Sequence, residues 1–201
     1  YDGARARFAA AIEGDPSLEE AYQAWAEAAV ACANLEDAIA ACTRGHEADR
    51  GYVPFLLVRG RSHLTIGLER FVRGEDSRAP MEAAAADFGA LVALAPNHAA
   101  GWAGRGCARM NLGVAAFLRG GDAAELYRGA VADLDRALAL HPGDRWSWFG
   151  RGNARLNLSR AIADQGLDDE GLVAQAIADF TRALEVDPGF VEARQNRGMA
   201  S

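Results

Sequence analysis

The chain has 201 residues and a formal net charge of −7, with half of its residues apolar and about a quarter charged. This composition is typical of a folded globular protein and excludes disorder, and no stretch approaches the roughly 18 consecutive apolar residues that a membrane span requires. The acidic balance disfavours nucleic acid as a partner, because affinity for phosphate backbones depends mainly on clustered positive charge.

Two further features of the composition indicate the kind of source genome and the cellular compartment. All 21 basic residues are arginine and none is lysine, which together with abundant alanine and glycine indicates a GC-rich bacterial genome. Cys32, Cys42 and Cys107 lack metal-site spacing, so we interpret them as small buried apolar residues in a reducing cytoplasm. The chain starts at Tyr1 without a targeting segment, and we expect it to be a piece of a longer cytoplasmic protein.

The first predicted helix covers residues 4–15. Its sequence, ARARFAAAIEGD, resembles the stretch DFTRALEVD, and each of the two stretches is followed directly by a proline, Pro16 or Pro188. The first helix therefore corresponds to the second helix of a repeated unit. A complete unit of 34 residues, 16–49, follows. Within this unit, residues 18–32 and 35–48 carry apolar side chains at helical spacing and predict two helices that turn at Asn34.

The dipeptide Arg-Gly recurs every 46 residues, at 59–60, 105–106, 151–152 and 197–198. Three other kinds of residue keep this register: Pro96, Pro142 and Pro188; Asp87, Asp133 and Asp179; Gly74, Gly120 and Gly166. A fixed period of this size indicates a stacked array of one supersecondary unit. We therefore predict a single repeat domain over 1–201, which comprises a partial unit 1–15, the unit 16–49, units of 46 residues at 50–95, 96–141 and 142–187, and a partial unit 188–201.

The additional residues of the long units lie between their two helices, around 71–80, 117–126 and 163–172. Each insertion carries a glycine suited to a helix C′ position and then an aspartate suited to an N-cap, at Asp76, Asp122 and Asp168. We therefore predict that both helices lengthen and meet in a short turn. A first helix of about 20 residues would be about 30 Å long.

The aligned units read Trp-x2-Arg-Gly-x2-Arg at 102–109 and 148–155, and Ala-x3-Phe or Ala-x3-Leu at 84–88, 130–134 and 176–180, with proline eight residues later. This pattern resembles the tetratricopeptide repeat (TPR), W-x2-L-G-x2-Y, A-x3-F and P, over nearly the whole chain. The resemblance implies an all-α fold, a right-handed α-solenoid of antiparallel helix hairpins that forms a TPR-like superhelix. The sequence departs from the family in its 46-residue period and at the family's leucine and tyrosine positions, which hold Arg59, Arg105 and Arg151, and His63, Arg109 and Arg155.

The arginine series has two interpretations. A row of guanidinium groups would suit anion binding. However, an aspartate follows each arginine by 28 residues, and a helix hairpin places the two on facing helices. We favour structural ion pairs, namely Arg59 with Asp87, Arg105 with Asp133 and Arg151 with Asp179.

The sequence contains no recognisable motif for catalysis, a metal or a cofactor. The glycine-rich runs at 101–106 and 150–152 lack a preceding strand and the residue order of a phosphate loop. The four histidines show neither metal-site nor catalytic spacing, and the serines and cysteines lack a base at a recognisable distance. We therefore expect neither enzymatic activity nor a bound metal or cofactor.

In arrays of the resembled family, first helices line a concave groove, which implies that ligand-binding residues lie on that face. We select Arg61, Asn111, Trp146, Phe149, Asn153 and Asn157, because amides read a peptide backbone and aromatic side chains supply apolar anchors. The open alternative is that these side chains pack within tall hairpins or are simply hydrated. The lysine and asparagine pattern with which some members clamp a terminal carboxylate is missing, because the chain has no lysine.

These patterns lead to one main hypothesis and one alternative. The main hypothesis is an adaptor or regulatory module of a larger bacterial protein, which binds a protein or peptide segment in its groove. The net acidic charge favours a neutral or basic segment. The alternative is a structural homo-oligomer that stacks through the solenoid ends. We expect neither nucleic acid nor a membrane as partner.

Overall fold

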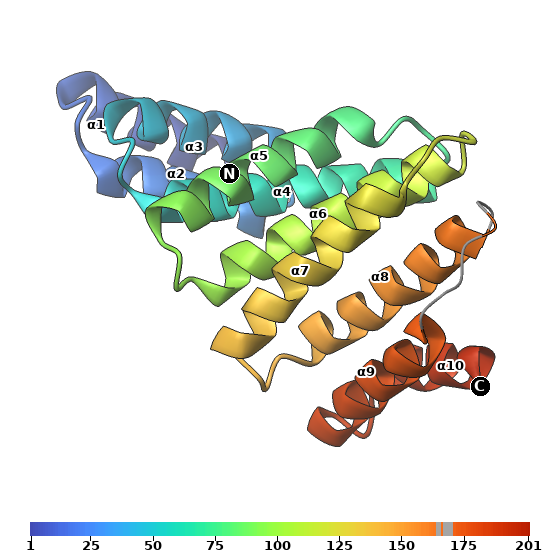
Figure 1. Ribbon diagram of the computed structural model, residues 1–201. Coiled ribbons are helices and arrows are strands. Elements are labelled where there is room, and N and C mark those ends of the chain that lie inside the picture. Colours follow the sequence, from blue (N-terminus) through green and yellow to red (C-terminus); the bar gives the residue numbers. More distant parts are fainter. Residues whose placement is uncertain (164–165, 167–170) are drawn as a thin grey trace. The chain divides into compact units, whose positions relative to one another are not determined.

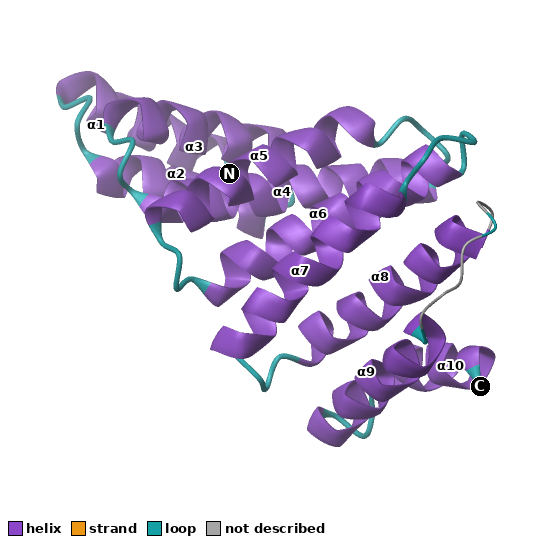
Figure 2. Cartoon of the chain, viewed as in Figure 1, coloured by secondary structure: helices purple, strands orange, loops and turns teal. Residues whose placement is uncertain are grey.

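The computed structural model describes residues 1–163, 166 and 171–201. All regular secondary structure in these residues is α-helical, which confirms the expected fold class (Figure 2). The helices are α1 (Asp2–Gly14), α2 (Glu19–Ala31), α3 (Leu35–Ala48), α4 (Val53–Val72), α5 (Arg78–Leu94), α6 (Ala99–Phe117), α7 (Ala124–Leu140), α8 (Arg145–Ala163), α9 (Leu172–Val186) and α10 (Val191–Ala200). They form two compact units, Tyr1–Pro96 with α1 to α5 and Asn97–Ser201 with α6 to α10.

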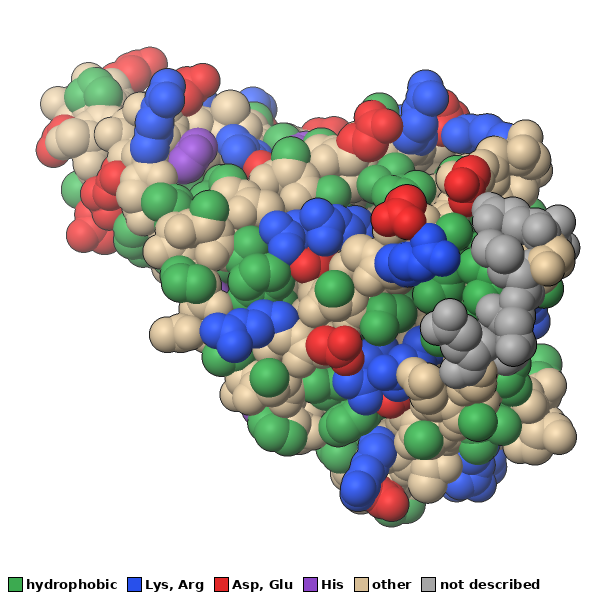
Figure 3. All heavy atoms as spheres, viewed as in Figure 1, with side chains coloured by type: hydrophobic (Ala, Val, Ile, Leu, Met, Phe, Trp, Pro, Cys, Tyr) green, Lys and Arg blue, Asp and Glu red, His purple; other side chains and the backbone are tan. Residues whose placement is uncertain are grey.

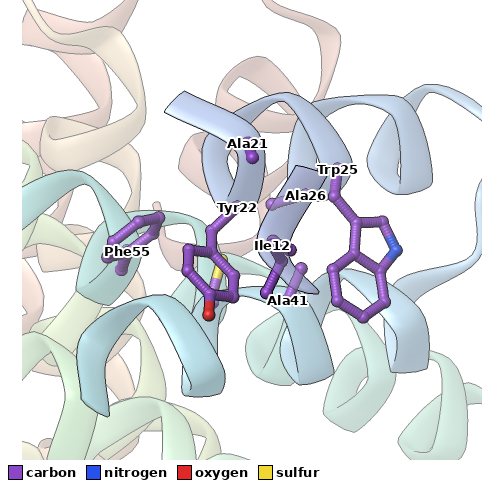
Figure 4. Close-up of a cluster of buried hydrophobic side chains, with 8 residues drawn as sticks. Ile12, Ala21, Tyr22, Trp25, Ala26, Ala41 and Phe55 are labelled. Atoms are coloured by element: carbon purple, nitrogen blue, oxygen red, sulfur yellow. The ribbon is translucent and has the colours of Figure 1, made fainter. Parts of the chain in front are cut away.

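In the first unit, each helix packs against the next one along the chain (Figure 1). Large side chains from three helices meet in one core, which contains Ile12 of α1, Tyr22 and Trp25 of α2, and Phe55 of α4 (Figure 4). The edge of one aromatic ring meets the face of another, with the centroids of Tyr22 and Phe55 6.4 Å apart. Helix α3 contributes the small Ala41, which leaves room for these rings.

The first unit combines a short hairpin with a tall one. Helices α2 and α3 have 13 and 14 residues, whereas α4 has 20, so α4 is longer than α2 by about 10 Å at 1.5 Å per residue. Glu69 and Arg70 near the end of α4 are exposed, but their counterparts 92 residues later, Ala161 and Ile162 of α8, are buried against the start of α7. The sequence thus places charged residues where a short neighbour leaves a long helix in solvent.

The short turns predicted inside the long units are confirmed for the first two. Gly74 and Gly120 have φ angles of +74° and +75°, and the next residue in each turn donates its N–H five residues back, from Glu75 to Arg70 and from Gly121 to Ala116. This is the Schellman arrangement, in which glycine adopts the left-handed conformation at low cost.

The expected N-cap aspartates need a correction of one residue. The N-caps of α5 and α7 are Ser77 and Ala123, but the carboxylates of Asp76 and Asp122 still accept the N–H two residues on, each at 3.0 Å. The aspartate therefore satisfies a free helix N–H from just outside the helix. In the third turn Gly166 has a φ of +73°, and Asp168 lies outside the described residues.

The second unit contains the tall hairpins α6–α7 and α8–α9 and then α10, which packs against α9 (Figure 1). A close approach explains Gly152 on α8, because a Cβ at that position would lie 2.6 Å from the ring of Phe180 on α9. No helix in the described part of the chain has both the length and the hydropathy of a membrane span.

Candidate functional site

The arginine and aspartate series forms a polar seam inside the long hairpins. In the first pair, Arg59 Nη2 lies 2.7 Å from Asp87 Oδ1. Arg105 and Asp133 share two hydrogen bonds, Nε to Oδ2 at 2.9 Å and Nη2 to Oδ1 at 2.6 Å. Two donors on one carboxylate give a bidentate geometry, which favours a fixed orientation of the two helices. The structure therefore brings together the residues that the 28-residue spacing placed opposite each other.

Each aspartate of the seam has a second basic partner that we did not expect from the sequence. Arg109 Nη1 lies 2.7 Å from Asp133 Oδ2, and Arg155 Nη1 lies 2.5 Å from Asp179 Oδ2. In the first long unit His63 takes this place, with Nδ1 3.0 Å from Asp87 Oδ2. The sequence did contain a signal for these second partners. Each of them follows the ion-paired arginine of its unit by one helical turn and occupies the position where the resembled family has tyrosine.

The electrostatics of the seam favour the ionised form of Asp87. Burial alone would raise the pKa of Asp87, but hydrogen bonds from His63 and Arg59 outweigh it, and its pKa is lowered. Burial likewise would lower the pKa of Arg151, yet its bonds to Asp179 and Asp135 raise that pKa. These guanidinium groups are therefore engaged within the protein, which leaves the anion-binding interpretation of the row without support.

Arg105 and Arg151 also stack on tryptophan. The guanidinium carbon of Arg105 lies 4.7 Å from the centre of the Trp102 ring, and that of Arg151 lies 4.7 Å from the Trp148 ring. A planar cation over an aromatic face is attracted by the ring quadrupole. The replacement of the family's leucine by arginine is thus accommodated by the tryptophan one turn earlier.

A hollow of about 500 Å³ lies in the second unit, at α8 and α10. Its lining combines apolar side chains with amides: Met110, Leu156, Val173, Met199 and Ala200, with Asn153, Asn157, Ser159, Arg160 and Asn196. Such a mixture suits a peptide, because apolar groups bind side chains and a few polar groups fix the backbone.

Two of the predicted groove residues, Asn153 and Asn157, line this hollow. Asn196 Nδ2 on α10 donates to Asn153 Oδ1 at 2.7 Å, which links the two helices across the hollow. Within the described residues the Asn157 amide has no hydrogen-bond partner. It therefore retains both of its donors and its acceptor for a ligand.

The other predicted groove residues lie elsewhere. Trp146 and Phe149 pack against Phe190 near the start of α8, with ring centroids 4.7 and 5.1 Å away, although Trp146 remains 54% exposed. Asn111 Nδ2 donates to the Cys107 carbonyl of its own helix at 2.8 Å. Arg61 lines a separate hollow of about 310 Å³ in the first unit, beside Val30, Leu35 and Val58. The Phe149 side chain is thus engaged in local packing, and the Asn111 amide is engaged in a hydrogen bond within its own helix.

The described residues contain no group of three or more His, Cys, Asp and Glu side chains able to hold a metal ion. Burial raises the pKa of the Cys42 thiol to about 12 and that of Cys107 to about 11. Both thiols are therefore protonated at neutral pH and poor nucleophiles.

On the face drawn in Figure 3, basic and acidic side chains are interspersed with apolar ones, as on an ordinary solvated surface.

Solved structures resemble this arrangement of hairpins. MamA from residue 41 to its end, from Desulfovibrio magneticus RS-1, matches with a TM-score of 0.68 and 16% identity over 90% of this chain and 82% of that one. YrrB, described as a TPR protein with an unusual peptide-binding site, matches with a TM-score of 0.59 and 21% identity over 96% of this chain and 81% of that one. This chain has the fold of a TPR array.

A third similar TPR structure contains a ligand. The second TPR domain of human RPAP3, in complex with the HSP70 peptide SGPTIEEVD, matches with a TM-score of 0.51 and 18% identity over 74% of this chain and 98% of that one. No protein-family model and no curated protein matches the sequence. In the TPR array described here, α8 and α10 are first helices of successive repeats, so the hollow with the three asparagines lies where first helices meet.

Proposed function

We propose that this TPR array is a protein-interaction module that binds an uncharged segment of a partner protein in the hollow between α8 and α10. The observation that carries the proposal is the Asn157 amide, which lines the hollow and has no partner among the described residues. An unpaired amide is suited to read a peptide backbone, because it offers a donor and an acceptor on one side chain.

The net charge of the chain and the charge in the lining of the hollow together favour a neutral ligand. The net charge of −7 favours a neutral or basic segment. Arg160, however, is the charged side chain in the described lining, and it would repel a second cation. A neutral segment satisfies both conditions, and the apolar surfaces of Met110, Leu156 and Met199 provide a place for one apolar anchor.

The comparisons support the same class of function. YrrB has a peptide-binding site by its description, and the RPAP3 domain holds a peptide. We therefore propose an adaptor or regulatory role without catalysis for this chain, in the bacterial cytoplasm, with neither nucleic acid nor a membrane as partner.

The test uses peptides selected from a displayed random library on the whole chain. The affinity of a selected neutral peptide is then measured for Asn157→Ala, for Asn153→Ala and for the matched control Asn111→Ala. Asn111 has the equivalent place one repeat earlier, but its amide already bonds to its own helix. Loss of one ligand hydrogen bond should weaken binding by about 1 kcal/mol, or roughly fivefold, in the first two variants only.

The proposal fails if the selected peptides bind all three variants as tightly as the original chain. Circular dichroism of each variant separates lost binding from lost folding.

A further inference from the structure

The short hairpin α2–α3 and the tall hairpin α4–α5 form a step in the first unit. Helices α2 and α4 begin at the same place in their repeats, three residues after Pro16 and Arg50. Because α2 has 13 residues and α4 has 20, the last two turns of α4 continue past the end of α2. The difference of about 10 Å is close to the diameter of an α-helix with its side chains. Both hairpins are complete, so the step belongs to the array itself.

The hollow of about 310 Å³ in the first unit lies at the foot of this step. The short hairpin and α4 each contribute part of its lining: Val30, Ala31 and Leu35, with Val58, Arg61 and Thr65. Val30 is 45% exposed. On α4, helical spacing continues the face of Arg61 and Thr65 to Leu68 and Val72, and Val72 is 84% exposed. An uncovered apolar surface therefore begins in the hollow and continues along the step.

The charges around the hollow leave one cation without a partner. Glu27, which also lines the hollow, accepts a hydrogen bond from Gln23 Nε2 at 2.8 Å. Farther along α4, Arg73 Nη2 lies 3.0 Å from Glu69 Oε2. Within the described residues, the side chain of Arg61 has neither an ion pair nor a hydrogen bond. The hollow thus offers apolar contacts beside a free guanidinium group, which suits a carboxylate.

We propose that this step docks a helix of a partner protein that presents an apolar side chain and, one turn away, Asp or Glu. The apolar side chain fills the hollow between Val30 and Val58, and the carboxylate pairs with Arg61. One helix matches the height of the step, and its apolar stripe would remove Leu68 and Val72 from water. The site is separate from the hollow between α8 and α10 and selects an acidic rather than an uncharged segment.

The local charge, rather than the net charge, decides the sign of this partner. The net charge of −7 is spread over the chain, and exposed charges more than about 10 Å apart are largely screened at 0.1 M salt. A carboxylate in the hollow would contact Arg61 directly, whereas a basic side chain would be repelled by it.

The test selects peptides on the whole chain from a displayed library of 12-residue helix-forming sequences and removes those that also bind Arg61→Glu. We expect the remaining peptides to share an apolar and an acidic residue three or four positions apart. By fluorescence anisotropy, Arg61→Glu should weaken binding of one labelled peptide at least roughly tenfold. A peptide with Arg in place of its acidic residue should bind Arg61→Glu again. Thr65→Trp should abolish binding, because the indole fills the hollow.

Controls separate this site from other surfaces. Arg128→Glu reverses an exposed charge on α7, and Asn157→Ala alters the other hollow, so neither should change the affinity. A benzophenone attached to the exposed Cys32, which lies between Ala31 and Leu35 in the sequence, should cross-link to the bound peptide.

The inference is overturned if no selected peptide depends on Arg61, if the peptides lack acidic residues, or if Thr65→Trp remains folded and binds as tightly as the original chain. Weaker binding to Asn157→Ala would assign the peptide to the other hollow instead. A dimer in light scattering that Thr65→Trp dissociates would also overturn the inference, since the occupant would then be a second copy of this chain.

Discussion

Arg105 and Asp133 are joined by two hydrogen bonds, and Asp133 is the more buried partner, with 3% of its side chain exposed against 19% for Arg105. A carboxylate at such a position is stable only while its partners are in place, because it is shielded from water. The seam therefore orients α6 and α7 more strictly than apolar packing alone would do.

We expect Arg105→Ala to destabilise the second unit by about 3 kcal/mol, because it leaves the buried Asp133 with Arg109 alone. The double variant with Asp133→Ala should lose less than the sum of the two single variants. The measurement is the free energy of unfolding in urea. Arg128→Ala, which removes an exposed pair with Glu125, is the control and should change stability by less than about 1 kcal/mol. Additive losses would contradict the coupling.

Gly152→Ala should lower the free energy of unfolding by about 1 to 2 kcal/mol. The new Cβ would lie 2.6 Å from Phe180, and the cost of overpacking exceeds the gain of about 1 kcal/mol in helix propensity. Gly198→Ala is the matched control, since its Cβ meets nothing within 4 Å, and it should be neutral or slightly stabilising. If both substitutions stabilise the protein, the close approach of α8 and α9 is wrong.

Asp87 should contribute to the loss of stability in acid. Its pKa is lowered in the folded protein from the usual 3.8, so its contribution is complete above that pH and is lost as the pH falls through the lower folded-state pKa. In Asp87→Asn, the free energy of unfolding should therefore fall less steeply below about pH 4 than in the original chain. Thermal unfolding across this range measures both slopes, and parallel slopes would contradict the assignment.

One thiol of three should react rapidly in the folded protein. Cys32 is exposed, whereas burial raises the pKa of Cys42 to about 12 and that of Cys107 to about 11, which leaves almost no thiolate for attack at neutral pH. Alkylation followed by mass spectrometry should show one fast addition to the native chain and three after unfolding. Cys32→Ser should remove the fast addition, and its persistence would show that a second thiol is accessible.

The sequence alone predicted the helical secondary structure and one ion pair in each long hairpin. Its 46-residue period and helical spacing predicted the long helices and turns, because a stacked array repeats the same local contacts in every unit. The spacing of 28 residues between Arg105 and Asp133 was sufficient to predict their ion pair, because this spacing places the two residues opposite each other within one hairpin.

Tertiary structure decided which polar side chains remain available for a partner. Asn111 and Asn157 are equivalent in sequence, but only the first bonds to its own helix, at Cys107, whereas the second lines a hollow. Equivalent residues differ because availability depends on which neighbouring helix covers each one, and a local pattern does not carry that information.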